Sequence, residues 1–162
     1  MEKKPKRRTP ERILETALRL FNENGEPGVT TTAIADEMNI SPGNLYYHYH
    51  SKEKIVEALF AAFRDEIERT LAAPESRLAH AEDAWLFLHL IFEAIYKYRF
   101  LYRDLNDLVS RHRLLETQFK RILAHKKRTA IAILQGLVQS GEMMAGPLDV
   151  EALAVNMTVV AT

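Results

Sequence analysis

The segment from Thr30 to Lys54 constrains the fold of this chain more than any other part of the sequence. It holds two short helical patterns, and the first of them would bury Ile34 and Ala35. Asn39 follows, and asparagine tolerates the left-handed backbone of a sharp turn. Ser41 can then cap a second helix. The pattern predicts a helix-turn-helix, whose second helix is placed to enter the major groove of DNA.

The outward positions of this motif carry side chains suited to DNA. Pro42 and Gly43 are small enough for close backbone approach, and Asn44 can donate and accept at a base edge. Threonine hydroxyls at the start of one helix and a lysine further on suit phosphate oxygens. The alternative is an ordinary helical hairpin with surface aromatics. The predicted DNA-binding residues are Thr30, Thr31, Thr32, Ser41, Pro42, Gly43, Asn44, Tyr46, Tyr47, His48 and Lys52.

Charge is distributed unevenly along the chain, although the net charge is zero. Residues 1–12 carry six basic and two acidic side chains, a local charge of +4, which leaves −4 on the remainder. A basic arm of this kind can follow phosphates or enter the minor groove. A solubilising tail would have the same composition, so both interpretations stay open.

Helical periodicity recurs along the rest of the chain, and sustained strand alternation is absent. Thr9 and Gly25 mark the ends of a first helix, and Ser51 caps a fourth. A solvated helix face explains Lys126, Lys127 and Arg128 most simply. Asp149 is expected to cap the last helix. The predicted class is all-α, with later helices over residues 81–98, 101–111, 114–140 and from 149 onward.

Several function classes are excluded by missing motifs. The chain has no cysteine, which rules out disulfides and thiolate metal sites and fits a cytoplasmic location. No signal peptide or membrane-spanning run is visible. We find no glycine-rich phosphate loop, no nucleophile elbow and no histidines at metal-ligand spacing. The sequence therefore predicts neither an enzyme nor a cofactor- or metal-binding protein.

Residues 10–60 resemble the TetR family of transcriptional regulators. The resemblance is carried by Ile34-Ala35, Ser41, Gly43, Leu45-Tyr46, His48, Tyr49 and Ser51-Lys52-Glu53. It implies a homodimer that binds a pseudo-palindromic operator in double-stranded DNA. It assigns Thr31 and Lys52 to phosphates, and Thr32, Pro42, Gly43, Asn44 and Tyr46 to bases. Asn39 stands where the family often has glycine, and Pro42 where it often has a polar residue.

The resemblance also implies a helical body that binds a small apolar or amphipathic effector and releases a repressor from its operator. The expected organisation is a basic arm over 1–8, a helix-turn-helix domain over 9–50, a linking helix over 51–73 and an effector-binding and dimerisation domain over 74–162, incomplete at the C-terminus. Candidate ligand contacts are Trp85, His89, Phe92, Tyr96, Tyr102 and Phe119, for which ordinary core packing is the alternative. The competing function is a helical protein-interaction module without ligand control.

Overall fold

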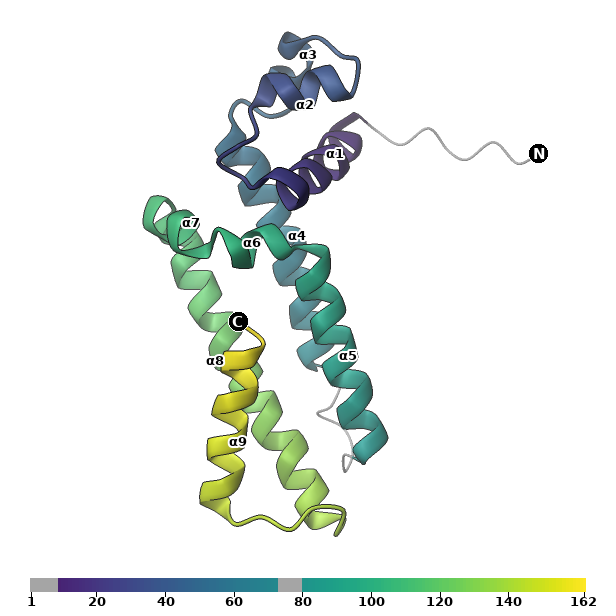
Figure 1. The fold of residues 1–162 in the computed structure, drawn as a ribbon, viewed down its shortest axis with the longest axis vertical. Helices are drawn as coiled ribbons and strands as arrows, with labels where there is room; N and C mark the ends of the chain where they lie inside the picture. Colours follow the sequence, from purple (N-terminus) through teal and green to yellow (C-terminus); the bar gives the residue numbers. More distant parts are fainter. Residues whose placement is uncertain (1–8, 73–79) are drawn as a thin grey trace, which may run out of the picture. The chain divides into compact units, whose positions relative to one another are not determined.

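The computed structural model describes residues 9–72 and 80–162, and every regular element in these ranges is a helix (Figure 1). This confirms the all-α class. The predicted basic arm and the boundary at Pro74 lie outside the described residues. Backbone contacts divide the chain into two units, one extending to Ala62 and including Tyr98–Asn106, the other containing Phe63–Lys97 and Asp107–Thr162.

The first unit is built around the helix-turn-helix. Its helices are α1 (Thr9–Asn24), α2 (Thr31–Glu37), α3 (Pro42–His48), the beginning of α4 (Lys52–Ala72) and α6 (Arg99–Arg103). Apolar side chains at helical spacing on these elements form its core, with exposed fractions of 3% or less: Ile13, Ala17, Phe21, Ile34, Ala35, Leu45, Ile55, Val56, Phe100 and Leu101.

The turn at Asn39 and the Ser41 cap predicted for the helix-turn-helix are confirmed, and Thr30 provides a further cap. Asn39 has a φ of 55°, in the left-handed region that such a turn requires. Thr30 caps α2, its hydroxyl accepting a hydrogen bond from the Ala33 N–H at 3.1 Å. Ser41 does the same for α3 through the Asn44 N–H at 3.2 Å. Each cap satisfies a backbone donor that the first helical turn would otherwise leave without a partner.

The prediction of a single helix over 101–111 is wrong, because the helix is interrupted at Asp104. One short helix, α6, ends at Arg103, and α7 (Leu105–Arg111) follows. The physical reason is tertiary: the Asp104 carboxylate accepts a hydrogen bond from the Glu26 N–H at 2.8 Å. This contact spans 78 positions of sequence, so local periodicity carries no sign of it. Asp104 belongs to the first unit, whereas most of α7 belongs to the second.

The second unit contains the end of α4 together with α5 (Ala81–Lys97), α7, α8 (Arg113–Gln139) and α9 (Pro147–Val160). Small and branched side chains form the core between α8 and α9: Ala130, Leu134, Val150 and Ala154. Lys97 on α5 forms an ion pair with Glu66 on α4 at 2.6 Å. The Thr129 hydroxyl on α8 donates to the Leu71 carbonyl of α4 at 3.4 Å.

Two details of this unit differ from the sequence-based expectation. α9 begins at Pro147, and Asp149 lies inside it, its carboxylate accepting from the Gly146 N–H at 2.9 Å. Asp149 is therefore the third helical residue, whose carboxylate bonds back to the N–H of the N-cap Gly146, rather than the cap itself. Lys126 is buried rather than solvated, with 4% of its surface exposed. Its ammonium donates to the Ala161 carbonyl at 2.8 Å, which gives a partner to one of its N–H groups inside the protein. No helix within the described ranges has the length and hydropathy needed to cross a bilayer.

Candidate nucleic-acid interface

Helix α3 buries one side and presents the other to solvent. Leu45 is 1% exposed and fixes the helix to the core, while Tyr46 and Tyr47 are 61% and 79% exposed. Two large aromatic side chains held outward on a seven-residue helix leave apolar surface in water. This is the arrangement expected of a helix that reads a groove.

A hollow of about 620 Å³ lies beside this face. The starts of three helices surround it, so backbone N–H groups and hydroxyls converge there. The hydroxyls and N–H groups at these helix starts, and the position of the hollow next to α3, suit a phosphate of the DNA backbone. The lining residues from α2, α3 and α4 and their caps include Thr30, Thr31, Pro42, Gly43, Tyr46, His50, Ser51 and Lys52.

The hollow brings together six of the eleven predicted DNA-binding residues: Thr30, Thr31, Pro42, Gly43, Tyr46 and Lys52. Four others, Thr32, Ser41, Asn44 and Tyr47, are exposed outside its lining. His48 is half-buried, and its ring meets the ring of Tyr47 edge-on at 5.2 Å. DNA contact by each of these residues stays a prediction.

Sequence reasoning did not name His50 and Ser51 among the DNA-binding residues, although both line the hollow. The His50 ring lies 5.2 Å from the ring of Tyr46. Helix α3 ends at His48 and Tyr49 has an extended backbone, so helical spacing gave no signal for the contact between Tyr46 and His50. Tyr49, also in the lining, is half-buried, and burial raises the pKa of its phenol.

Gly43 has open space where a side chain would be. A Cβ built on it would meet only the Ser41 hydroxyl, at 4.0 Å. Packing within the described part of the chain therefore does not require glycine at this position. The absence of a side chain leaves the backbone of α3 accessible on the side of the hollow.

Lys52 is paired inside the protein as well as bordering the hollow. Its ammonium lies 3.1 Å from the Glu26 carboxylate and donates to the Glu26 carbonyl at 3.1 Å. Glu26 is 1% exposed, and the Lys52 side chain is 22% exposed. The sequence pattern indicates a point charge at Lys52 but gives no sign of this buried partner in the loop after α1.

The six candidate ligand residues occupy different surroundings. Trp85, Phe92 and Tyr96 are 68%, 46% and 70% exposed. His89 is exposed and stacks on Trp85, with ring centroids 5.4 Å apart and planes within 3°. Tyr102 belongs to the first unit, and its burial raises the pKa of its phenol well above the ordinary value. Phe119 is buried in α8. Ligand contact by these residues stays a prediction.

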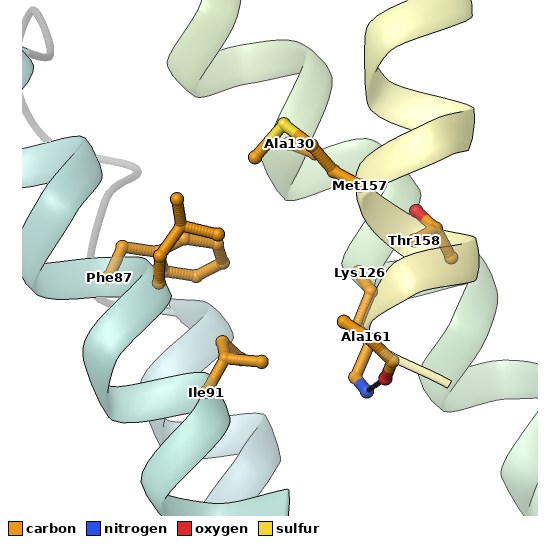
Figure 2. Close-up of a pocket in the computed structure, with 8 residues that line it drawn as sticks. Phe87, Ile91, Lys126, Ala130, Met157, Thr158 and Ala161 are labelled. Atoms are coloured by element: carbon orange, nitrogen blue, oxygen red, sulfur yellow. Dashed lines mark hydrogen bonds between the residues drawn. The ribbon is translucent and has the colours of Figure 1, made fainter.

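The second unit contains a small apolar hollow between α5, α8 and α9. Figure 2 shows Phe87 and Ile91 facing Lys126, Met157 and Ala161 across it, and Leu88, Ala130 and Thr158 complete the lining. Its free volume is only about 20 Å³, enough for about one water molecule. An organic molecule would fit only after the helices move apart. Desolvation lowers the pKa of Lys126, the charged residue of this lining, to about 8.

The helix-turn-helix with its exposed α3 face defines a DNA-binding protein of the helix-turn-helix class. A family model for bacterial regulatory proteins of the tetR family matches residues 13–59, and one described as bacterial transcriptional repressor matches residues 62–162. The chain belongs to the TetR family of bacterial transcriptional regulators.

Individual relatives agree with this assignment. A TetR-family transcriptional regulator from Marinobacter aquaeolei VT8 has a crystal structure with a TM-score of 0.90 and 31% sequence identity, covering 96% of this chain and 77% of that one. The probable HTH-type transcriptional regulator YttP of Bacillus subtilis (strain 168) is 25% identical over 83% of this chain. The biofilm operon icaADBC negative transcriptional regulator IcaR of Staphylococcus aureus (strain Newman) is 30% identical over 60% of it. The chain spans 65% and 53% of these two curated relatives.

Proposed function

We propose that this chain is a sequence-specific repressor that binds operator DNA through α3. The observation that carries the proposal is the exposed outer face of α3 beside a hollow lined by three helix starts. Side chains at the beginning of α3 would contact base edges, whereas Thr31 and Lys52 would contact phosphates. Bound over a promoter, the protein would block transcription.

We propose further that the protein acts as a homodimer. Support comes from α9, which exposes apolar side chains that a monomer would leave in water: Leu148, Leu153, Val155, Val159 and Val160, at 40% to 83% exposure. A two-fold dimer would place two copies of α3 in successive major grooves, about 34–36 Å apart or a multiple of that distance. The operator would then be pseudo-palindromic.

Control by an effector is the third part of the proposal. The hollow between α5, α8 and α9 is apolar and has one buried cation, which suits a small apolar or amphipathic molecule with a polar end. Such a molecule would bind the conformation in which these helices are separated. If that conformation binds DNA less tightly, the effector releases the operator, and DNA weakens effector binding by the same factor.

Selection of bound fragments from sheared genomic DNA of the source organism tests this function. At near-physiological salt, we expect enrichment of one palindromic sequence, and its affinity should fall steeply as salt increases because bound counterions are released. Genes beside the enriched site would indicate the effector class. A folded, dimeric chain that enriches no fragment would instead favour a helical protein-interaction module.

A further inference from the structure

Helices α1 and α6 cap one another within the first unit. The Asn22 side chain, near the end of α1, accepts a hydrogen bond from the Phe100 N–H in the first turn of α6, at 3.1 Å. In return, Arg103 at the end of α6 donates to the carbonyls of Phe21 and Asn22. The rings of Phe21 and Phe100 pack between these polar contacts at 5.2 Å, and neither is exposed. These contacts fix α6 against the end of α1.

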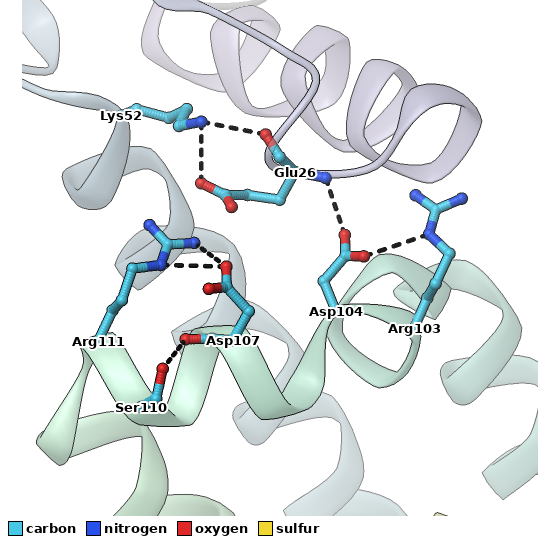
Figure 3. Close-up of polar contacts among 7 residues, drawn as sticks. All are labelled: Glu26, Lys52, Arg103, Asp104, Asp107, Ser110 and Arg111. Atoms are coloured by element: carbon cyan, nitrogen blue, oxygen red, sulfur yellow. Dashed lines mark hydrogen bonds and ion pairs between the residues drawn. The ribbon is translucent and has the colours of Figure 1, made fainter.

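A chain of polar contacts continues from α6 to Lys52 (Figure 3). Asp104, which follows α6, accepts from the Glu26 N–H at 2.8 Å, and its carboxylate also pairs with Arg103 at 3.5 Å. Glu26 then holds the Lys52 ammonium with both its carboxylate and its carbonyl, each at 3.1 Å. The position of α6 is thereby linked to the position of a predicted phosphate contact through two residues.

The geometry around Lys52 favours a positioning role for this chain of contacts. An ammonium has three N–H donors, and Glu26 engages two of them. In the described residues the third has no partner, and Lys52 lines the hollow beside α3. A lysine fixed in this way loses less side-chain freedom when a phosphate binds than one that moves in solvent.

We propose that Glu26 and Asp104 are positioning residues for the phosphate contact of Lys52, so that operator affinity depends on the docking of α6. The inference rests on the function proposed above, and it adds two acidic residues that do not themselves touch DNA. When α6 leaves its place, Asp104 releases the loop at Glu26. Lys52 then loses the fixed partner that holds its ammonium beside the hollow.

The simplest alternative is that the Glu26–Lys52 pair only stabilises the fold. Lys52→Ala cannot separate the two roles, because it would remove the ammonium that pairs with the buried carboxylate of Glu26, which is strongly destabilising. The double variant Glu26→Gln with Lys52→Met removes the ion pair between these residues without leaving a buried charge. It serves as the neutral background for the test. The backbone N–H at position 26 can still donate to Asp104, so the contact between Asp104 and the loop is kept in that background.

A double-mutant cycle on operator binding tests the proposal. Asp104→Ala is measured in the unsubstituted chain and in the neutral background, at a salt concentration where all proteins bind. We expect an affinity loss of about five-fold in the first case and less than about two-fold in the second, because coupled residues give non-additive effects. Asp107→Ala is the matched control, since that carboxylate, at the start of α7, pairs with Arg111 and not with Glu26.

Three results would overturn the inference. An equal loss of operator affinity in both backgrounds would mean that Asp104 acts on the first unit generally and not through Lys52. No loss of affinity in either background would mean that Asp104 does not affect operator binding. Asp104→Asn keeps an acceptor for the Glu26 N–H, so it should restore most of the affinity; failure to do so would contradict the proposed contact. If the unsubstituted chain bound no operator fragment, the proposed function itself would fail.

Discussion

The side-chain oxygen of Asn22 accepts a hydrogen bond from the backbone N–H of Phe100 at 3.1 Å, across 78 positions of sequence. Phe100 is the second residue of α6, and the N–H groups of a first helical turn have no partner within their own helix. A side chain from α1 therefore supplies the cap that α6 lacks, since Tyr98 at its N-cap position makes no capping hydrogen bond.

Replacing Asn22 with alanine should destabilise the first unit. Loss of a helix cap costs about 0.5–2 kcal/mol, and we expect the free energy of unfolding to fall by about 1 kcal/mol. Urea denaturation measures this loss, and hydrogen exchange at the Phe100 amide locates it. Asn24→Ala is the control, because among the described residues Asn24 bonds only within its own helix, to the Leu20 carbonyl at 3.2 Å. Equal effects of both changes would show that the contact with α6 contributes nothing.

Gly43→Ala should separate DNA binding from folding. The added Cβ meets only the Ser41 hydroxyl at 4.0 Å, so the fold should be unharmed, and alanine in a helix gains about 0.5–1 kcal/mol over glycine. Affinity for the operator should still fall about ten-fold or more, because the methyl group occupies space that close backbone approach to a base needs. Thermal unfolding and fluorescence anisotropy measure the two effects. Gly141→Ala is expected to lower the thermal stability, since Gly141 has a φ of 80°, and to leave operator affinity unchanged, since it lies in the second unit. Unchanged operator affinity in Gly43→Ala would remove α3 from the interface.

Asn44→Ala should relax sequence preference at a single position of the operator. Loss of a side-chain contact to a base edge costs about 1–3 kcal/mol and leaves binding to the other positions unchanged. The Asn44 backbone N–H still bonds Ser41, so α3 keeps its cap. Binding to a set of operators with single base substitutions measures the effect. A uniform loss across all of them would mean that Asn44 contacts a phosphate instead.

Burial of Lys126 makes the stability of the second unit depend on pH. Desolvation lowers the pKa of its ammonium from 10.5 to about 8. Between these values the unfolded chain holds a proton that the folded chain has released, so this group makes the free energy of unfolding rise with pH across the window. Lys126→Met should remove a rise on the order of 2 kcal/mol between about pH 7.5 and about pH 10.

Denaturant unfolding at a series of pH values measures this difference. Lys127→Met is the matched control, since Lys127 is the next residue of α8 and forms an ion pair with Glu151 at 3.0 Å. The comparison uses the difference between each variant and the unsubstituted chain, so that other titrating groups cancel. Identical pH profiles for Lys126→Met and the unsubstituted chain would contradict the burial of a charged lysine.

The helix-turn-helix was predictable because its signals are local. Ser41 and Asn39 each act on backbone groups within a few residues, and the structure confirms both roles. The C-terminal ends of α1 and α8 were predictable for the same reason, because Gly25 and Gly141, which follow these helices, adopt positive φ. In each case a cap or a turn residue determines the local backbone by itself.

Two of the errors come from contacts between residues far apart in sequence. The break at Asp104 depends on Glu26, and the burial of Lys126 depends on the end of α9, 35 residues away. Neither partner leaves a periodic pattern around the residue it affects. Glu26 was missed as the partner of Lys52 for the same reason, because Glu26 lies in the loop after α1 and Lys52 at the start of α4.

The assignment of α6 to the first unit has a consequence for exchanging parts between regulators of this family. A chimera joined at one point within α4 would take residues up to 62 from one protein and α6 from another. The residues equivalent to Asn22 and Phe100 would then come from different parent proteins. Two further crossovers are needed so that residues 98–106 come from the same protein as the rest of the first unit. Modular redesign of this chain therefore has to treat its DNA-binding unit as two separate stretches of sequence.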